Sequence, residues 1–225
     1  MNSRLFVILI GLGSLPLGGC LTYYPNLIKT PSLKHAGEGH VGGYITNNAF
    51  DAYAAYAVSG DVATILSGSV GYDNHDRQTS AHLFVEGGVG TFGKPSPRIT
   101  SEAFAGFGFG ETSTVSADSA VFSENGNYMR LYVASDATYN LGAMDIGIAT
   151  RIVAVDFVTG RQSLGGGSDF GVFLEPAPFW RFGWERLKFE SQIGTSFHIL
   201  SHPGFGTEKF FFGAGVHFIL PELVH

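Results

Sequence analysis

The stretch FFFGAGVHFIL, residues 210–220, changes the character of its side chains at every second position. The even positions are all apolar: Phe210, Phe212, Ala214, Val216, Phe218 and Leu220. The odd positions are mostly small or polar: Phe211, Gly213, Gly215, His217 and Ile219. Because successive side chains of a β-strand point to opposite faces, this pattern predicts a strand with one apolar face and one face of small and polar residues.

The same period of two recurs through most of the chain before this stretch. It predicts strands near residues 38–46, 49–58, 62–72, 79–92, 99–110, 128–139, 143–157, 169–179, 186–199 and 208–220. We therefore expect an all-β, antiparallel fold with ten strands. Pro176 and Pro178 cannot donate to a ladder, so the eighth strand is expected to end near Glu175 or to be bulged there. Merging of strands near one end would leave eight.

The composition indicates which face of these strands is covered. Charged residues make up 14% of the chain, where about 25% is usual. Glycine accounts for 32 of the 225 residues and phenylalanine for 20. A soluble barrel packs large side chains inward, whereas here the less apolar face is rich in glycine and the apolar face has almost no Lys or Glu. This distribution predicts an up-and-down transmembrane β-barrel with lipid outside and a narrow lumen inside.

The connections between the expected strands alternate in length. Short links are expected at Ser59–Asp61, Gly93–Arg98, Asn140–Gly142 and Arg181–Glu185. Longer links are expected at 73–80, Glu111–Asn127, 159–168 and 201–207, although the first turn, near Asn47, is tight. Bacterial barrels have short periplasmic turns and longer outer loops, and an even number of strands puts both ends on one side. We expect the N-terminus on the periplasmic side.

Several ionisable side chains fall on the predicted lumen face: Glu86, Glu102, Arg130, Asp145, Arg151, Glu175, Lys188 and Glu190. Paired carboxylates can serve acid–base catalysis, but mixed signs inside a narrow barrel favour a structural network of ion pairs. We expect this network to fill most of the lumen and prevent porin-like conduction.

Three other motifs could carry chemistry. The GVGTFG run from Gly88 to Gly93 matches a dinucleotide fingerprint, but no helix is expected after it. His198 and His202 have the spacing of metal ligands on a helix, yet they run from a strand into a loop. His198 and Ser201 could belong to a hydrolase site at the outer rim. We expect no catalytic residues, no metal and no cofactor.

The N-terminus carries a different signal. Arg4 precedes the apolar run LFVILIGLG, residues 5–13, which is too short for a spanning helix and suits an export signal. The run leads to LGGC, which ends at Cys20, the single cysteine of the chain. LGGC resembles the lipobox of bacterial lipoproteins. The resemblance implies a signal peptide over residues 1–19 and a covalent lipid, including palmitate, on Cys20; an ordinary secretory signal with a chance cysteine is the alternative.

Two further resemblances concern the ends of the barrel. Residues 20–37 lack a clear period and contain two prolines, so we expect a lipidated tether before a barrel of residues 38–220. The order of residues from Tyr24 to Glu38 is similar to the entry segment of small lipoproteins with an outer-membrane barrel. Gly215, Phe218 and Leu220 resemble the C-terminal insertion signal of such barrels, followed by a tail, residues 221–225.

Together these features predict an outer-membrane β-barrel lipoprotein with a structural or interaction role, as a monomer. Its expected partners are outer-membrane lipid and the lipoprotein-sorting and barrel-insertion machineries; Leu21 is not the aspartate that retains lipoproteins in the inner membrane. Lys and Arg are not clustered, which argues against nucleic acid. The alternatives are a lipid-anchored periplasmic lipocalin-like barrel that binds a ligand, and an outer-membrane hydrolase.

Overall fold

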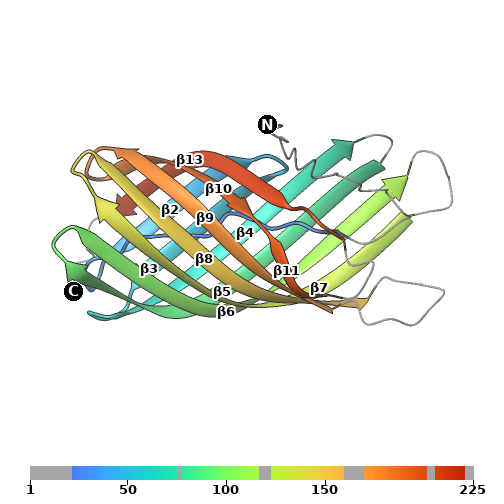
Figure 1. Ribbon diagram of the computed structural model, residues 1–225, viewed down its shortest axis with the longest axis horizontal. Helices are drawn as coiled ribbons and strands as arrows, with labels where there is room; N and C mark the ends of the chain where they lie inside the picture. The colour runs from blue at the N-terminus through green and yellow to red at the C-terminus, as the bar shows by residue number, and fades with distance from the viewer. Residues whose placement is uncertain (1–21, 76–77, 117–122, 160–169, 202–205, 221–225) are drawn as a thin grey trace, which may run out of the picture.

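The computed structural model describes residues 22–75, 78–116, 123–159, 170–201 and 206–220. These residues form a closed antiparallel barrel of ten strands, which confirms the predicted fold class (Figure 1). The strands are β2 (Gly39–Thr46), β3 (Ala49–Ala57), β4 (Val62–His75), β5 (Gln78–Ser96), β6 (Ile99–Ser116), β7 (Ser123–Asn140), β8 (Met144–Thr159), β9 (Phe170–Gly183), β10 (Leu187–Thr195) with its continuation β11 (Phe197–Ser201), and β13 (Phe210–Leu220).

The barrel closes where β10 pairs with both β9 and β13. After an interruption at Ser196 the chain continues as β11, which pairs with β9 alone. A short parallel pair joins β1 (Thr22–Tyr23) to β12 (Gly206–Thr207) beside this seam. The count of ten strands therefore treats β10 and β11 as one wall element, and the alternative of eight strands is wrong.

Several strands extend further than predicted at the end with the longer connections. β6 runs to Ser116 and β7 begins at Ser123, although residues 111–127 were expected to form a loop. Their ladder continues to the pair Val115↔Ser123. Most of the polar residues predicted to form a loop therefore belong to β6 and β7, which extend beyond the apolar part of the wall.

The proline-containing strand β9 is also longer than expected, because it continues to Gly183. Its ladder with β8 is regular through both prolines. On its other side, the pairing stops at Leu174 and resumes at Phe179, so Pro176 and Pro178 lie in the gap between β11 and β10. A missing N–H costs little where no ladder bond is made on that side. The expected link Arg181–Glu185 is thus replaced by a turn that begins after Gly183.

The two faces of the wall have the predicted characters. Leu83, Val85 and Val89 of β5 are more than half exposed, while His82 and Glu86, at positions of the opposite parity, are buried in the lumen. The inner glycines make room for aromatic rings from neighbouring strands. A Cβ added at Gly110 would lie 2.2 Å from the ring of Tyr128, and one at Gly106 would lie 2.7 Å from the ring of Tyr132. Bulky inner rings can therefore lie against the wall.

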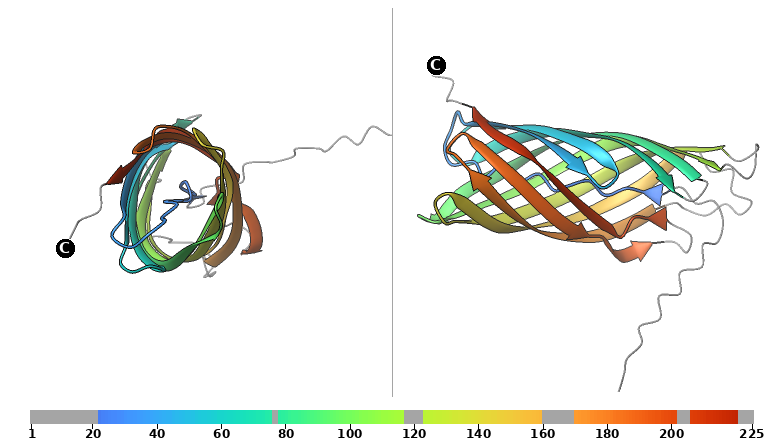
Figure 2. Two further views of the ribbon diagram at one scale, coloured as in Figure 1. Left: turned by 90° about the vertical axis from the view of Figure 1, so that its left-hand side faces the viewer. Right: turned by 90° about the horizontal axis from the view of Figure 1, so that it is seen from above.

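Residues 22–37 are not a tether outside the barrel, and that prediction is wrong for the described part of the segment. The segment passes through the lumen, where the end-on view shows it enclosed by the strands (Figure 2). Tyr23, Leu27, Ile28 and Leu33 are at most 3% exposed. Among the described residues, no helix has the length and hydropathy needed to cross a membrane.

Candidate functional site

The lumen holds several buried ion pairs. All eight predicted lumen residues are buried inside the barrel, each at most 9% exposed, and seven of them belong to these pairs. Glu86 of β5 pairs with Arg130 of β7 across the one strand between them, β6, where Gly108 lies opposite both residues. Arg151 Nε donates to Glu175 Oε2 at 2.7 Å between the neighbouring strands β8 and β9. Lys188 Nζ lies 3.2 Å from Asp145 Oδ2 near the short-turn end. Buried charges are stable only when they are paired in this way.

Glu190 does not pair with any of the predicted bases. Its partner is Arg181, which the structure places inside the lumen at 1% exposure. The sequence analysis missed Arg181 because it ended the eighth strand near the two prolines and therefore assigned Arg181 to the following turn. In β9, Arg181 has the same inward parity as Glu175, six positions earlier, which is the signal that could have found it.

Asn26 of the lumen segment links the two arginines in the middle of the barrel. Its Oδ1 accepts hydrogen bonds at 3.0 Å from Arg130 and from Arg151. Arg151 also donates to the Asn26 backbone carbonyl at 2.9 Å. The arginines thus bind both their carboxylate partners on the wall and the segment, so the ion pairs and the segment stabilise one another.

Lys29 of the segment pairs with the wall strand β3. Its Nζ lies 2.6 Å from Asp51 Oδ2, and both side chains are at most 3% exposed. The same carboxylate oxygen accepts the backbone N–H of Leu27 at 3.0 Å. Neither Lys29 nor Asp51 belonged to the predicted lumen set.

The backbone of the segment is satisfied by wall side chains instead of by a ladder. Gln192 accepts from Ile28 N at 2.8 Å and donates to Ile28 O at 3.0 Å. The carboxylate of Glu102 accepts the backbone N–H groups of Ser32 and Leu33 at 2.8 and 2.7 Å. Buried backbone groups need such partners, and these side chains supply them to an irregular chain.

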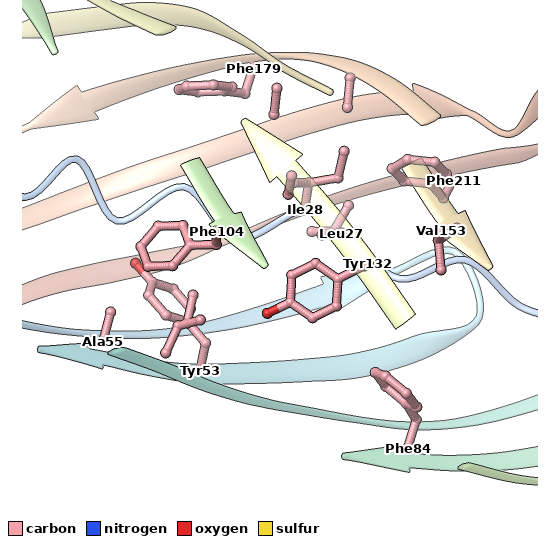
Figure 3. Close-up of a cluster of buried hydrophobic side chains, with 14 of the residues drawn as sticks. Leu27, Ile28, Tyr53, Ala55, Phe84, Phe104, Tyr132, Val153, Phe179 and Phe211 are labelled. Atoms are coloured by element: carbon pink, nitrogen blue, oxygen red, sulfur yellow. The ribbon is translucent and has the colours of Figure 1, made fainter. Parts of the chain in front are cut away.

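Apolar side chains of the segment fill the remaining space. Leu27 and Ile28 lie at the centre of the buried cluster, with Phe104, Tyr132 and Phe211 around them (Figure 3). Small cavities of about 20 and 30 Å³ lie among the described lumen residues. Each has room for about one or two water molecules.

The segment is fixed at its far end by the turn into β2. The carboxylate of Glu38 accepts the Lys34 backbone N–H at 2.7 Å and lies 2.8 Å from Nε2 of His40. Burial raises the pKa of Glu38, but the hydrogen bonds with His40 and Lys34 outweigh it, so the pKa lies below its ordinary value. Glu38 is therefore charged at neutral pH and caps this turn.

The other predicted motifs do not form sites within the described residues. Gly88, Gly90 and Gly93 all lie inside β5, where a Cβ at Gly90 would meet the backbone of β6 at 2.2 Å. His198 is on the exposed strand β11, with its ring against Phe173, and His202 lies outside the described residues, as does Cys20. In the described ranges, no group of three or more His, Cys, Asp or Glu side chains is arranged to hold a metal ion.

Comparison with solved structures finds outer-membrane barrels. The chain is similar to Ail, the attachment invasion locus protein of Yersinia pestis (11% identity, TM-score 0.39, covering 82% of this chain and 99% of that one). It is also similar to the N-terminal β-barrel domain of Pseudomonas aeruginosa OprF (11%, 0.36, 83% and 99%) and to the translocator domain of the autotransporter NalP from Neisseria meningitidis (9%, 0.46, 81% and 86%). No protein-family model and no curated protein sequence matches the chain.

Proposed function

We propose that this chain is a lipoprotein of the bacterial outer membrane whose barrel spans the bilayer with a closed lumen, and that its role is structural or interaction-based. The observation that carries the proposal is the belt of exposed apolar side chains around the outside of the wall. It includes Ile45, Phe50, Leu66, Val85, Phe107, Leu131, Val133, Ile148, Ile152, Phe182, Ile193, Phe212 and Phe218, which are 44–73% exposed. A hydrocarbon environment is where such a belt is stable.

The placement of charge argues against a soluble, lipocalin-like barrel. Such a barrel would have apolar residues around its ligand and charges in water, whereas here Arg130, Arg151 and Arg181 are at most 2% exposed. Trp180, Phe182 and Trp184 are exposed near the short-turn end, as an aromatic girdle at a membrane interface would be. A filled interior leaves the outer wall and the long connections as the surfaces through which this barrel acts.

Lipid attachment at Cys20 is tested by the Cys20→Ala variant. We expect mass spectrometry to find that the unmodified protein begins at Cys20 and carries acyl chains there, and that the variant is not processed at this position. The variant barrel should still need detergent for extraction and should still migrate differently on gels with and without heating, because the apolar belt holds it in the bilayer. Release of the variant by a mild salt wash would contradict a spanning barrel; an unmodified Cys20 would contradict the anchor.

The closed lumen predicts the behaviour of the purified protein in planar bilayers. We expect no large, steady conductance, because the paired charges and residues 22–37 occupy the interior of a barrel that is already narrow. A porin of 16–18 strands inserted under the same conditions provides the positive control. Steady conductance of porin size from the unmodified protein would show that the segment does not occupy the lumen.

A further inference from the structure

We propose that the N-terminal anchor lies at the mouth of the barrel with the longer connections, opposite the mouth where β2 begins and β13 ends. Its lipid then enters the outer leaflet at the cell surface. This inference rests on the proposed function, that is, on a lipid at Cys20 and a barrel that spans the outer membrane. The lumen segment, residues 22–37, would then hold the surface anchor and the barrel together through the membrane.

The contacts of the segment show its direction along the lumen. On β9, Tyr23 Oη donates to Glu175 Oε1 at 3.2 Å, whereas Ser32 Oγ contacts Arg181, six positions closer to the short turn. On β10, Ile28 binds Gln192, and Thr30 lies next to Glu190, two positions closer to that same turn. The segment therefore runs without reversal from the long-connection end towards the short-turn end.

Both ends of the segment are fixed by backbone hydrogen bonds. At its start, β1 pairs with β12 in the long connection between β11 and β13, and Glu208 N donates to Tyr23 O at 3.1 Å. At its end, Gly37 N donates to Ala57 O at 2.9 Å, beside the short turn between β3 and β4. The side view shows β1 and the start of β2 at opposite ends of the barrel (Figure 2).

This placement corrects the expectation that the N-terminus is on the periplasmic side. The ends of the wall, Gly39 and Leu220, do lie together at the short-turn end. Thr22, however, lies at the other end, where bacterial barrels have their outer loops. Cys20 is two residues before Thr22, and two residues span at most about 7 Å. The lipid is thus confined to the neighbourhood of the long-connection mouth, on the far side of the filled lumen.

The wall beside this mouth suits an acyl chain. β10 and β13 stop pairing at Thr195↔Phe210, and β11 continues with β9 as its partner, so the wall divides next to β12 and β1. The outer surface along this division is apolar: Phe197, Ile199, Leu200 and Phe210 are 53–62% exposed. An acyl chain on Cys20 could follow these apolar side chains into the outer leaflet.

The experiment places a short epitope tag between Leu21 and Thr22, which leaves Cys20 and the segment intact. One control carries the tag after Gly60, in the short turn between β3 and β4, and another carries it between His75 and Gln78, in the β4–β5 connection. Antibody binding is measured on intact and on permeabilised cells. We expect the tag before Thr22 to bind on intact cells as fully as the His75–Gln78 control, and the Gly60 control to bind only after permeabilisation.

Two results would overturn the inference in distinguishable ways. If the tag before Thr22 binds only after permeabilisation while both controls behave as expected, the barrel spans as proposed but the anchor is not at the surface. If the two controls exchange their behaviour, the orientation assumed for the barrel is itself wrong. An acylated N-terminal peptide, measured on the same tagged protein, establishes that the anchor is present.

A disulfide tests the threading independently. Ser32 Oγ on the segment lies 3.2 Å from Thr138 Oγ1 on β7, so the two side chains are in contact and cysteines at these positions are expected to form a disulfide. The pair Ser32→Cys and Thr138→Cys should form a crosslink in the folded protein that disappears on reduction, whereas Ser32→Cys with Ser59→Cys should not. A folded barrel without the first crosslink would show that the segment is not in the lumen.

Discussion

The variant Arg151→Ala should lose about 3–5 kcal/mol of folding free energy, the cost of breaking a buried ion pair and leaving one charge without its partner. Glu175 is fully buried, and without Arg151 its remaining partners are the hydroxyl groups of Tyr23 and Ser196, both at 3.2 Å. The same change removes two hydrogen bonds to Asn26, so the lumen segment should also loosen. Equilibrium unfolding in urea, with the barrel in lipid vesicles, measures the loss.

The matched control is Arg98→Ala, which removes an exposed arginine whose side chain makes a long hydrogen bond, 3.4 Å, to Tyr139. A change of about 0.5 kcal/mol or less is expected there, as for other surface substitutions. Replacing both members of the buried pair, in Arg151→Met with Glu175→Leu, should recover part of the loss because no lone charge remains. A loss below about 1 kcal/mol for Arg151→Ala would mean that Glu175 is solvated and the lumen is open to water.

The facing of the strands could be predicted from the sequence because alternation along a strand directly records which side each residue occupies. Glu86, Arg130 and Asp145 were assigned to the lumen face of their strands, and the structure buries all three. The ends of the strands were less predictable. Beyond the apolar belt the hairpin of β6 and β7 is mostly polar, so the alternation that marks a strand fades while the ladder continues to the pair Val115↔Ser123.

The passage of β9 through two prolines could not be predicted from β9 itself. It depends on the interruption of the neighbouring wall element at Ser196, which removes the need for N–H donors on that side. A single-strand argument treats each proline as a lost hydrogen bond and ends the strand. Because the predicted strand ended too early, Arg181 was missing from the predicted set of lumen residues.

The lumen segment was missed for a related reason. It has no period of its own, because its backbone binds to side chains of many strands, such as Gln192 and Glu102, rather than to one partner strand. The predicted lumen set did contain a signal, since it had five carboxylates and only three basic residues. The excess negative charge required donors from elsewhere in the chain. Lys29 and the backbone N–H groups of Ser32 and Leu33 are among those donors.

The variant Val133→Arg should lose about 2–4 kcal/mol of folding free energy in lipid vesicles, as expected for arginine on the lipid face near the midplane. Val133 lies in the outer belt of β7, 59% exposed, opposite Ala105 of β6 and Ile152 of β8. Arginine there fits the wall without any steric clash inside the lumen, so the cost comes from the surroundings. Urea unfolding in vesicles again measures it.

The control is Leu141→Arg, at a position that is 50% exposed but in the short turn after β7. Arginine near the interface should cost about 0–1 kcal/mol, because its side chain can reach the headgroups and water. The two substitutions introduce the same side chain at similar exposure and differ in depth. Equal, small losses at both positions would show that water surrounds the wall of β7, and the apolar belt would then have to be covered by a partner protein instead of lipid.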